Sequence, residues 1–149
     1  MGIIITIIGS FCVYICMLFA VAADLNNDRQ EAVYQLVTIN KNFHDSERKI
    51  SSYDEAVNYK IISDSALKNN FIKENVKFDF SNDAMTMSVQ KDEFQICQQV
   101  VNKLGTLSKS GNLVIMVNGK PIKDVINSES NIDYSCSQND STLIKNELK

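Results

Sequence analysis

An N-terminal stretch without charged side chains constrains this chain more than any other feature of its sequence. All 15 basic and 18 acidic residues of the 149-residue chain lie at or after Asp24, so residues 2–23 carry none. As a helix with about 1.5 Å of rise per residue, this stretch would reach about 33 Å, and the hydrocarbon core of a bilayer is about 30 Å thick. We therefore predict a membrane-spanning helix over residues 2–23, which excludes a simple cytosolic globular protein.

Two other interpretations of this stretch stay open. A cleaved secretory signal would fit Ala20-Val21-Ala22 as its cleavage site, but the stretch has no basic start and exceeds a signal core of about 7–15 residues. A buried core helix is less favoured, because so long an uncharged run is rare inside a small domain. A retained anchor fits better than either. Flanking charges do not set its orientation, since the first basic residue is Arg29.

The helical pattern continues beyond the apolar stretch. After a polar break at residues 24–28, apolar residues recur at helical spacing, and no Pro or Gly occurs between Ser10 and Gly105. The pattern predicts one helix of about 45–50 residues, whose amphipathic part spans residues 24–52. We expect its apolar stripe to pack against the rest of the chain through Leu36, Phe43 and Ile50. The alternative is two helices with a hinge at Leu25-Asn26-Asn27.

Residues 53–149 have the size of one small domain. Strand patterns or edge-strand patterns occur at 76–80, 85–89, 113–117, 120–125, 132–137 and 142–144. Asn118-Gly119 predicts a tight turn, and Pro121 restricts the strand after it to an edge. A helix is predicted to begin at the N-cap Asp92 and to end at Gly105, after a short helix and loop at 53–70. The expected fold is α+β, with the long N-terminal helix on a small antiparallel sheet.

The cysteines indicate an oxidising compartment. Cys97 and Cys136 are far apart in the polar part of the chain, which suits a single disulfide and places this domain outside the cytosol. The bridge would close a C-terminal loop of about 40 residues and stabilise the domain by roughly 4 kcal/mol. Two free thiols are the alternative. Cys12 and Cys16 lie in the apolar stretch and behave there as small hydrophobic residues.

No pattern indicates catalysis or a cofactor. His44 is the only histidine, and its place beside Phe43 on the amphipathic helix favours a surface imidazole over a catalytic one. Cysteine and histidine do not cluster at zinc-ligand spacing, and no phosphate-binding or metalloprotease motif is present. The net charge is only −3, with both signs interspersed, which argues against nucleic acid as a partner. We predict a protein that is not an enzyme and needs no metal or cofactor.

Three segments, in this order along the chain, resemble the type IV pilins, most closely the type IVb branch. Residues 2–9 (GIIITIIG) resemble the middle of the pilin N-terminal helix. Residues 94–105 (FQICQQVVNKLG) resemble the helix that carries the first cysteine in type IVb subunits. Residues 114–119 (VIMVNG), followed by Cys136, resemble the strand, turn and second cysteine. The middle of the chain, 53–89, adds little to the resemblance.

The resemblance implies a structural subunit, preferably a minor one, of a type IV pilus or related filament. Its partners would be other pilin subunits and the pilus assembly machinery, with membrane lipid around the helix before assembly. The helix would sit in a bacterial inner membrane and the head in the periplasm, until assembly moves both into an extracellular filament. Residues that would bear assembly are Ile4, Ile8, Gly9 and Leu18.

This sequence departs from the pilin pattern at its start. It shows neither the basic leader ending in glycine nor the early helix glutamate of that family. Two explanations fit: Met1 is an internal start with the leader encoded upstream, or the chain is a minor subunit that does without the glutamate. A function from another class also stays open, a single-span anchored module that presents its disulfide-bridged domain to a ligand without polymerising.

Overall fold

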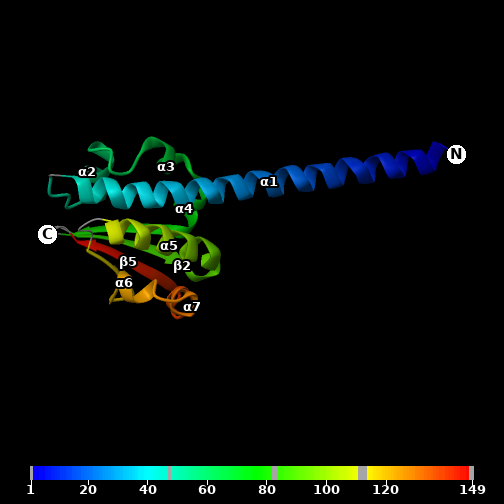
Figure 1. Cartoon of the computed structure of the whole chain (residues 1–149). Coiled ribbons are helices and arrows are strands. Elements are labelled where there is room, and N and C mark those ends of the chain that lie inside the picture. The colour runs from blue at the N-terminus through cyan, green and yellow to red at the C-terminus, as the bar shows by residue number, and fades with distance from the viewer. Residues whose placement is uncertain (1, 47, 82–83, 111–113, 148–149) are drawn as a thin grey trace.

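The structure is a computed structural model that describes residues 2–46, 48–81, 84–110 and 114–147, with side chains from Tyr14 onward except Ser110. Its dominant element is one helix, α1 (Gly2–Asp45), of 44 residues. Figure 1 shows α1 passing along the head and then extending far beyond it toward the N-terminus. The helix runs unbroken through Leu25-Asn26-Asn27, so the single-helix interpretation is correct and the hinge is not observed.

The helix ends a few residues earlier than predicted. Ser46 N donates to Phe43 O at 3.3 Å, and Arg48 N donates to Ser46 Oγ at 3.2 Å, so the chain turns away at this point. Ile50 consequently lies on the loop after α1 instead of on the helix itself. Its side chain returns to the core, where it is fully buried together with Leu36 and Phe43.

A connector of three short helices runs back along α1 from its C-terminal end. These are α2 (Tyr53–Asn58), α3 (Asp64–Lys68) and α4 (Asn70–Asn75). The sequence predicts only one short helix and a loop over 53–70. Each begins at a polar cap, since Ser52, Ser63 and Asn69 each accept a backbone N–H three residues ahead. Ser63 Oγ also donates to Gln35 Oε1 at 3.0 Å, which attaches the connector to α1.

The sheet has five antiparallel strands in the order β1-β2-β5-β3-β4. The strands are β1 (Val76–Ser81), β2 (Ala84–Gln90), β3 (Val114–Val117), β4 (Lys120–Pro121) and β5 (Ser141–Glu147). The strand that comes last in the sequence therefore lies in the middle of the sheet. A predicted edge strand at 142–144 is thus wrong in position, because β5 pairs with β2 on one side and with β3 on the other.

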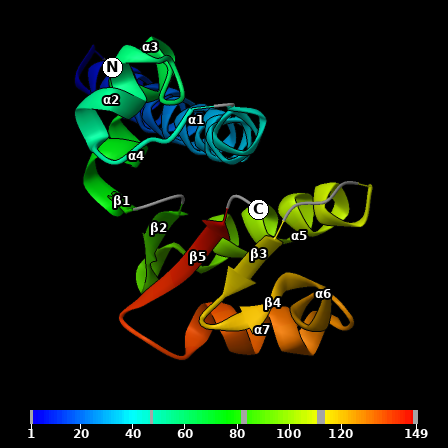
Figure 2. The same ribbon diagram turned by 90° about the vertical axis from the view of Figure 1, so that its left-hand side faces the viewer.

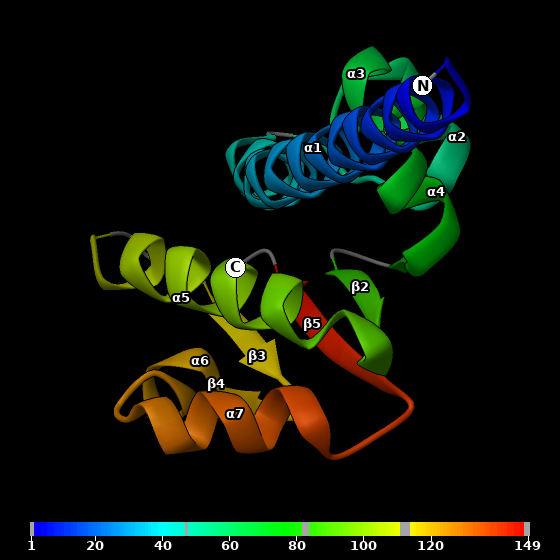
Figure 3. The ribbon, with the colours of Figure 1, turned by 90° about the vertical axis from the view of Figure 1, so that its right-hand side faces the viewer.

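Helices α1 and α5 (Phe94–Ser110) both lie against one face of this sheet. Asn146 Nδ2 of β5 donates to Asn40 O of α1 at 2.9 Å, and Thr142 Oγ1 lies 3.4 Å from Cys97 Sγ of α5. Figures 2 and 3 look along α1 from its two ends and show α1 with the connector on one side of the molecule. The short helices α6 (Ile122–Val125) and α7 (Glu129–Ser137) lie on the opposite side, beyond α5.

Four local predictions in the second half of the chain are wrong. Asp92 is not an N-cap, because it lies in a 3-10 turn, η1 (Lys91–Glu93), that precedes α5. Gly105 does not end α5, which continues to Ser110. The return strand expected at 120–125 is only the two-residue β4, and α6 follows it. The segment 132–137 is helical, since Ser128 caps α7 and Ile132 and Cys136 share its buried side.

The α+β prediction itself is confirmed, as is the packing of a long helix on a small antiparallel sheet. A single core joins α1, β2, α5 and β5, and its largest fully buried members include Phe43, Leu36, Met85, Met87, Leu104 and Ile144. Phe43 and Phe80 rings lie 6.1 Å apart between centroids, which connects α1 with β1. The head is therefore built around the second half of α1, which leaves the first half free of it.

Candidate functional site

The N-terminal half of α1 presents large apolar side chains to solvent. Exposed fractions range from 53% at Leu18 to 72% at Phe19. Among the described residues, the large exposed apolar side chains in this part of the helix are Tyr14, Met17, Leu18, Phe19, Val21 and Leu25. At 100° per residue all of these positions except Phe19 fall within an arc of about 100°, and the other sides of the helix expose the smaller apolar residues Cys16, Ala20, Ala22 and Ala23. A helix that is apolar all round is typical of a segment covered by other helices or by lipid.

Three of the four predicted assembly residues, Ile4, Ile8 and Gly9, lie among residues whose side chains fall outside the described set. Leu18 is the fourth, and the structure places it on the exposed part of α1. Among the residues that the structure describes, no helix has a stretch long and apolar enough to cross a membrane.

The exposed half of α1 meets the head at Asp28. Asp28 O accepts a hydrogen bond from Asn69 Nδ2 at 2.9 Å, and Asp28 Oδ2 accepts one from Phe71 N at 3.3 Å. One residue later, Arg29 forms an ion pair of 3.1 Å with Glu93 of η1. These contacts fasten the base of the head to α1, and the buried face of the helix begins just beyond them at Ala32.

The disulfide predicted between Cys97 and Cys136 is confirmed. It joins α5 to α7 with a Cα–Cα distance of 5.9 Å, and both cysteines are buried. Gln98 Nε2 donates to Asp133 Oδ1 between the same two helices. The bridge and this hydrogen bond hold α7 beside α5 immediately before the chain enters β5.

The Asn118-Gly119 turn does more than reverse the chain. Both residues have positive φ, 48° and 79°, as a tight hairpin turn between β3 and β4 requires. Asn118 Oδ1 accepts a hydrogen bond from Leu143 N of β5 at 2.8 Å, and Asn118 Nδ2 donates to Ser135 O of α7 at 2.7 Å. The sequence pattern predicts the turn, but it contains no signal for these two long-range hydrogen bonds.

His44 is the only histidine of the chain. Its imidazole is half-buried near the end of α1, and Nδ1 has no hydrogen-bond partner in the described part of the chain. Over the same part of the chain, no group of three or more His, Cys, Asp or Glu residues could hold a metal ion.

Comparisons of the chain with protein-family models, with curated proteins and with solved structures gave no match. The architecture nonetheless has the features that the pilin resemblance implied: a long N-terminal helix, a small antiparallel sheet and a disulfide near the C-terminal end. The two features that bear on function are therefore the exposed apolar half of α1 and the head that packs on its other half.

Proposed function

We propose that this chain is a structural subunit of a type IV pilus or related filament, and we favour a minor subunit over a major one. In this proposal it assembles through the N-terminal half of α1. The observation that carries the proposal is the apolar surface that α1 exposes between Tyr14 and Leu25. Large apolar surfaces on a single chain indicate contact with other proteins or with a membrane. The pilin-like architecture of the head and helix supports the same function.

Before assembly, the helix resides in a bacterial inner membrane. Residues 2–23 have no charge, and a helix satisfies its own backbone hydrogen bonds in lipid. The head lies in the periplasm, where an oxidising environment maintains the Cys97–Cys136 bridge. The polar residues from Asp24 to Asp28 then lie at the level of the lipid headgroups.

During assembly, the helix exchanges lipid for the same helix of other subunits. Ile4, Ile8 and Leu18 supply apolar contact, and the small residues Gly9 and Ala22 allow the backbones to approach closely. The heads then form the outer surface through head-to-tail contacts, which generate an open filament because they do not close into a ring. The partners are thus other pilin subunits and the machinery that assembles them.

Disulfide cross-linking tests this proposal. In a chain with Cys12→Ala and Cys16→Ala, one cysteine is introduced at Leu18, and a second variant carries it at Tyr34. Both side chains are exposed, but Tyr34 lies on the half of α1 that carries the head. Mild oxidation of cells that assemble the filament should cross-link Leu18→Cys chains far more than Tyr34→Cys chains, which report random collision. Equal, low cross-linking of the two variants would instead support the anchored module that does not polymerise.

Deletion of residues 2–23 supplies the complementary test. The head should still fold, because its core begins at Ala32, but the chain should no longer enter filaments. Normal function of the assembly with this deleted chain would contradict the proposal.

A further inference from the structure

In the described part of the chain, strand β1 pairs only with β2 and therefore forms one edge of the sheet. Figure 2 shows β1 at the outer left of the sheet, below α2 and α4, with its free side facing outward. The strand has six residues and contains neither proline nor glycine. An unblocked edge of this kind is a template on which another extended segment can pair.

Alternation along the strands shows which backbone groups of β1 face outward. Leu143 O accepts a hydrogen bond from the turn after β3, so the backbone groups of Leu143 point away from β2. Because bonded and non-bonded pairs alternate in antiparallel sheets, the registers of β5 with β2 and of β2 with β1 direct Lys77 and Asp79 toward β2. The N–H and C=O groups of Phe78 and Phe80 then point to the free edge, where no described residue bonds to them.

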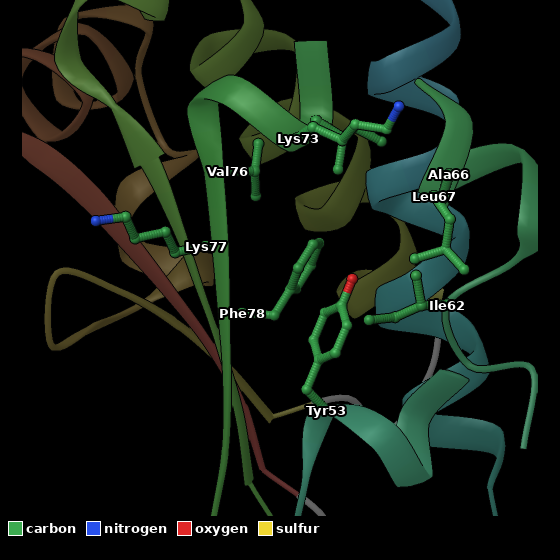
Figure 4. A pocket seen from close by; sticks show the side chains of 9 residues that line it. Tyr53, Ile62, Ala66, Leu67, Lys73, Val76, Lys77 and Phe78 are labelled. Carbon is green, nitrogen blue, oxygen red and sulfur yellow. The ribbon is translucent and has the colours of Figure 1, made fainter. Parts of the chain in front are cut away.

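The two faces of β1 carry different side chains. Figure 4 shows Lys77 on one side of the strand and Phe78 on the other. Lys77 and Asp79 are exposed, whereas Phe78 faces the connector. Together with Val76 and Ile62 it borders a largely apolar cavity of about 440 Å³ between the connector and β1. A strand added to this edge would place its apolar side chains on the cavity side and its charged ones on the exposed side.

The charges of β1 select the sequence of such a strand. Lys77 and Asp79 would each lie directly opposite one residue of the added strand. An antiparallel strand with the order apolar-basic-apolar-acidic-apolar places its base opposite Asp79 and its acid opposite Lys77. The same strand in the parallel direction, or shifted by two residues, places like charges opposite each other. Edge lysines often only prevent pairing, but the two signs on β1 are complementary to one direction and one register.

We infer that β1 binds an extended segment of another protein by antiparallel strand addition, and that this segment has the alternating order given above. Hydrogen bonds to the backbone of Phe78 and Phe80 supply the affinity. The two opposite-charge pairs, and the apolar side chains on the cavity side, supply the specificity.

A second copy of β1 carries the same pattern, but its pairing conflicts with the direction of α1. Helix α1 and β1 run the same way, because Asp28 bonds to Phe71 just before β1 and Phe43 packs against Phe80 near its end. An antiparallel β1 pair would therefore point the exposed halves of two α1 helices in opposite directions. Copies that lie in one bilayer cannot pair in this way, so the choice of another protein as occupant rests on the proposed function.

Peptide titrations of the full chain in phospholipid nanodiscs, followed by fluorescence anisotropy, test the inference. The probe peptide TVKFDFT has the required order, and TVKFKFT and TVDFDFT each place one like charge opposite Lys77 or Asp79. The probe should bind about fivefold more tightly than both of these peptides, whereas general charge attraction would favour one of them over the probe. Absence of saturable binding would overturn the inference. Tightest binding of TVDFKFT, whose charges fit only a parallel strand, would overturn the antiparallel direction.

Amide hydrogen exchange, measured by NMR, locates the bound peptide. At saturation, exchange should slow at Phe78 and Phe80 and change little at Lys77 and Asp79, whose N–H groups already bond to β2. Uniform slowing along β1, or slowing confined to α1, would overturn strand addition. Association of chains through β1 without peptide binding would overturn the choice of occupant in favour of a second copy.

Two variants at one position form a matched pair for the same titration. Phe78→Ala and Phe78→Pro both remove the ring, but only proline removes the N–H that points to the free edge, where proline is tolerated. The probe peptide should bind about tenfold more weakly to Phe78→Pro than to Phe78→Ala. Equal affinities would overturn strand addition. Peptide binding requires no assembly, so its failure and that of the proposed function are distinguishable.

Discussion

Asn118 connects three elements of the C-terminal region, namely the turn after β3, the helix α7 and the strand β5. Its side chain bonds to Ser135 of α7 and to Leu143 of β5, and its backbone N–H donates to Leu143 O at 2.8 Å. Its φ of 48° also suits asparagine or glycine better than other residues. Asn118 thus connects the turn with the central strand β5 and with α7, the helix that carries Cys136.

Replacement of Asn118 by glycine should separate these roles. Glycine keeps the positive φ but removes both side-chain hydrogen bonds, so the free energy of unfolding should fall by about 1–3 kcal/mol. Urea titration of the full chain in nanodiscs measures this change. Asn139→Gly, at an exposed asparagine in the loop between α7 and β5, is the matched control and should have little effect. Equal stability of the two variants would contradict the role assigned to the side chain.

Gly105 is required because Ile126 packs closely against α5 at this position, and not because the helix ends there. A Cβ on this residue would lie 2.6 Å from Cγ2 and 2.8 Å from Cδ1 of Ile126. Gly105→Ala should therefore introduce an overpacking penalty of about 1–3 kcal/mol, reduced by about 1 kcal/mol of helix propensity. We expect a net loss of about 1 kcal/mol in the free energy of unfolding.

A double-mutant comparison isolates that contact. In an Ile126→Ala background the clash is absent, so Gly105→Ala should become neutral or stabilising by up to about 1 kcal/mol. The same measured effect in both backgrounds would show that Ile126 is not the cause.

At the scale of elements, the disulfide helps to position β5, the strand that joins the two parts of the sheet. The bridge fixes the end of α7 against α5, and the chain passes from there into β5, which joins β2 to β3. Few apolar residues hold this region, because the buried face of β5 consists of Thr142, Ile144 and Asn146. The covalent bond therefore compensates for a small local core.

Reduction of the disulfide should lower the free energy of unfolding by about 2–4 kcal/mol, as expected for a closed loop of this length. The measurement compares urea titrations with and without a phosphine reductant, in a chain with Cys12→Ala and Cys16→Ala. A variant with Cys97→Ala and Cys136→Ala should already have the lower stability and should not respond to the reductant. Unchanged stability on reduction of the first protein would be the contrary result.

Elements whose signal is local were predictable from the sequence. The α1 stripe, the β1–β2 pair and the Asn118-Gly119 turn depend on periodicity or on turn residues, and the structure contains all three. The cysteine pair was predictable because no other cysteine lies in the polar part of the chain. The Leu36 and Phe43 part of the stripe is buried as the pattern indicates.

Elements whose environment is set by distant residues were not predictable. The central position of β5 has no local signal, since Thr142 and Asn146 face the core as polar residues. The sequence 132–137 alternates as a strand does, but the cap at Ser128 makes it helical. The local sequence predicts a helix end at Gly105, because nothing near this residue signals its contact with Ile126, 21 residues away in the sequence. The cavity beside β1 likewise depends on how three short helices fold back along α1.

For the whole molecule, the proposed function assigns folding and association to different halves of α1. Its second half is the central helix of the head, and its first half makes the exposed apolar surface. A polar change in the first half should therefore affect association without affecting the stability of the head.

Leu18→Asp tests this separation. In the proposed membrane helix over residues 2–23, Leu18 lies toward the C-terminal end, so an acidic residue there costs less than the roughly 2.5–3.5 kcal/mol at a helix centre, and the membrane-bound fraction of the chain should fall. The free energy of unfolding of the head should stay the same, because Leu18 lies outside its core. Tyr34→Asp, at an exposed residue on the second half, should change neither quantity. A loss of head stability in Leu18→Asp would show that the two halves are not independent.

The central place of β5 also sets an order of events during synthesis. Strands β2 and β3 cannot be joined until residues 141–147 have been made, and the uncharged stretch leaves the ribosome more than a hundred residues earlier. Under the proposed function, the helix would therefore reach its bilayer while the sheet of the head is still open. Any protein that guides the nascent chain at that stage therefore acts on a head whose sheet is not yet closed.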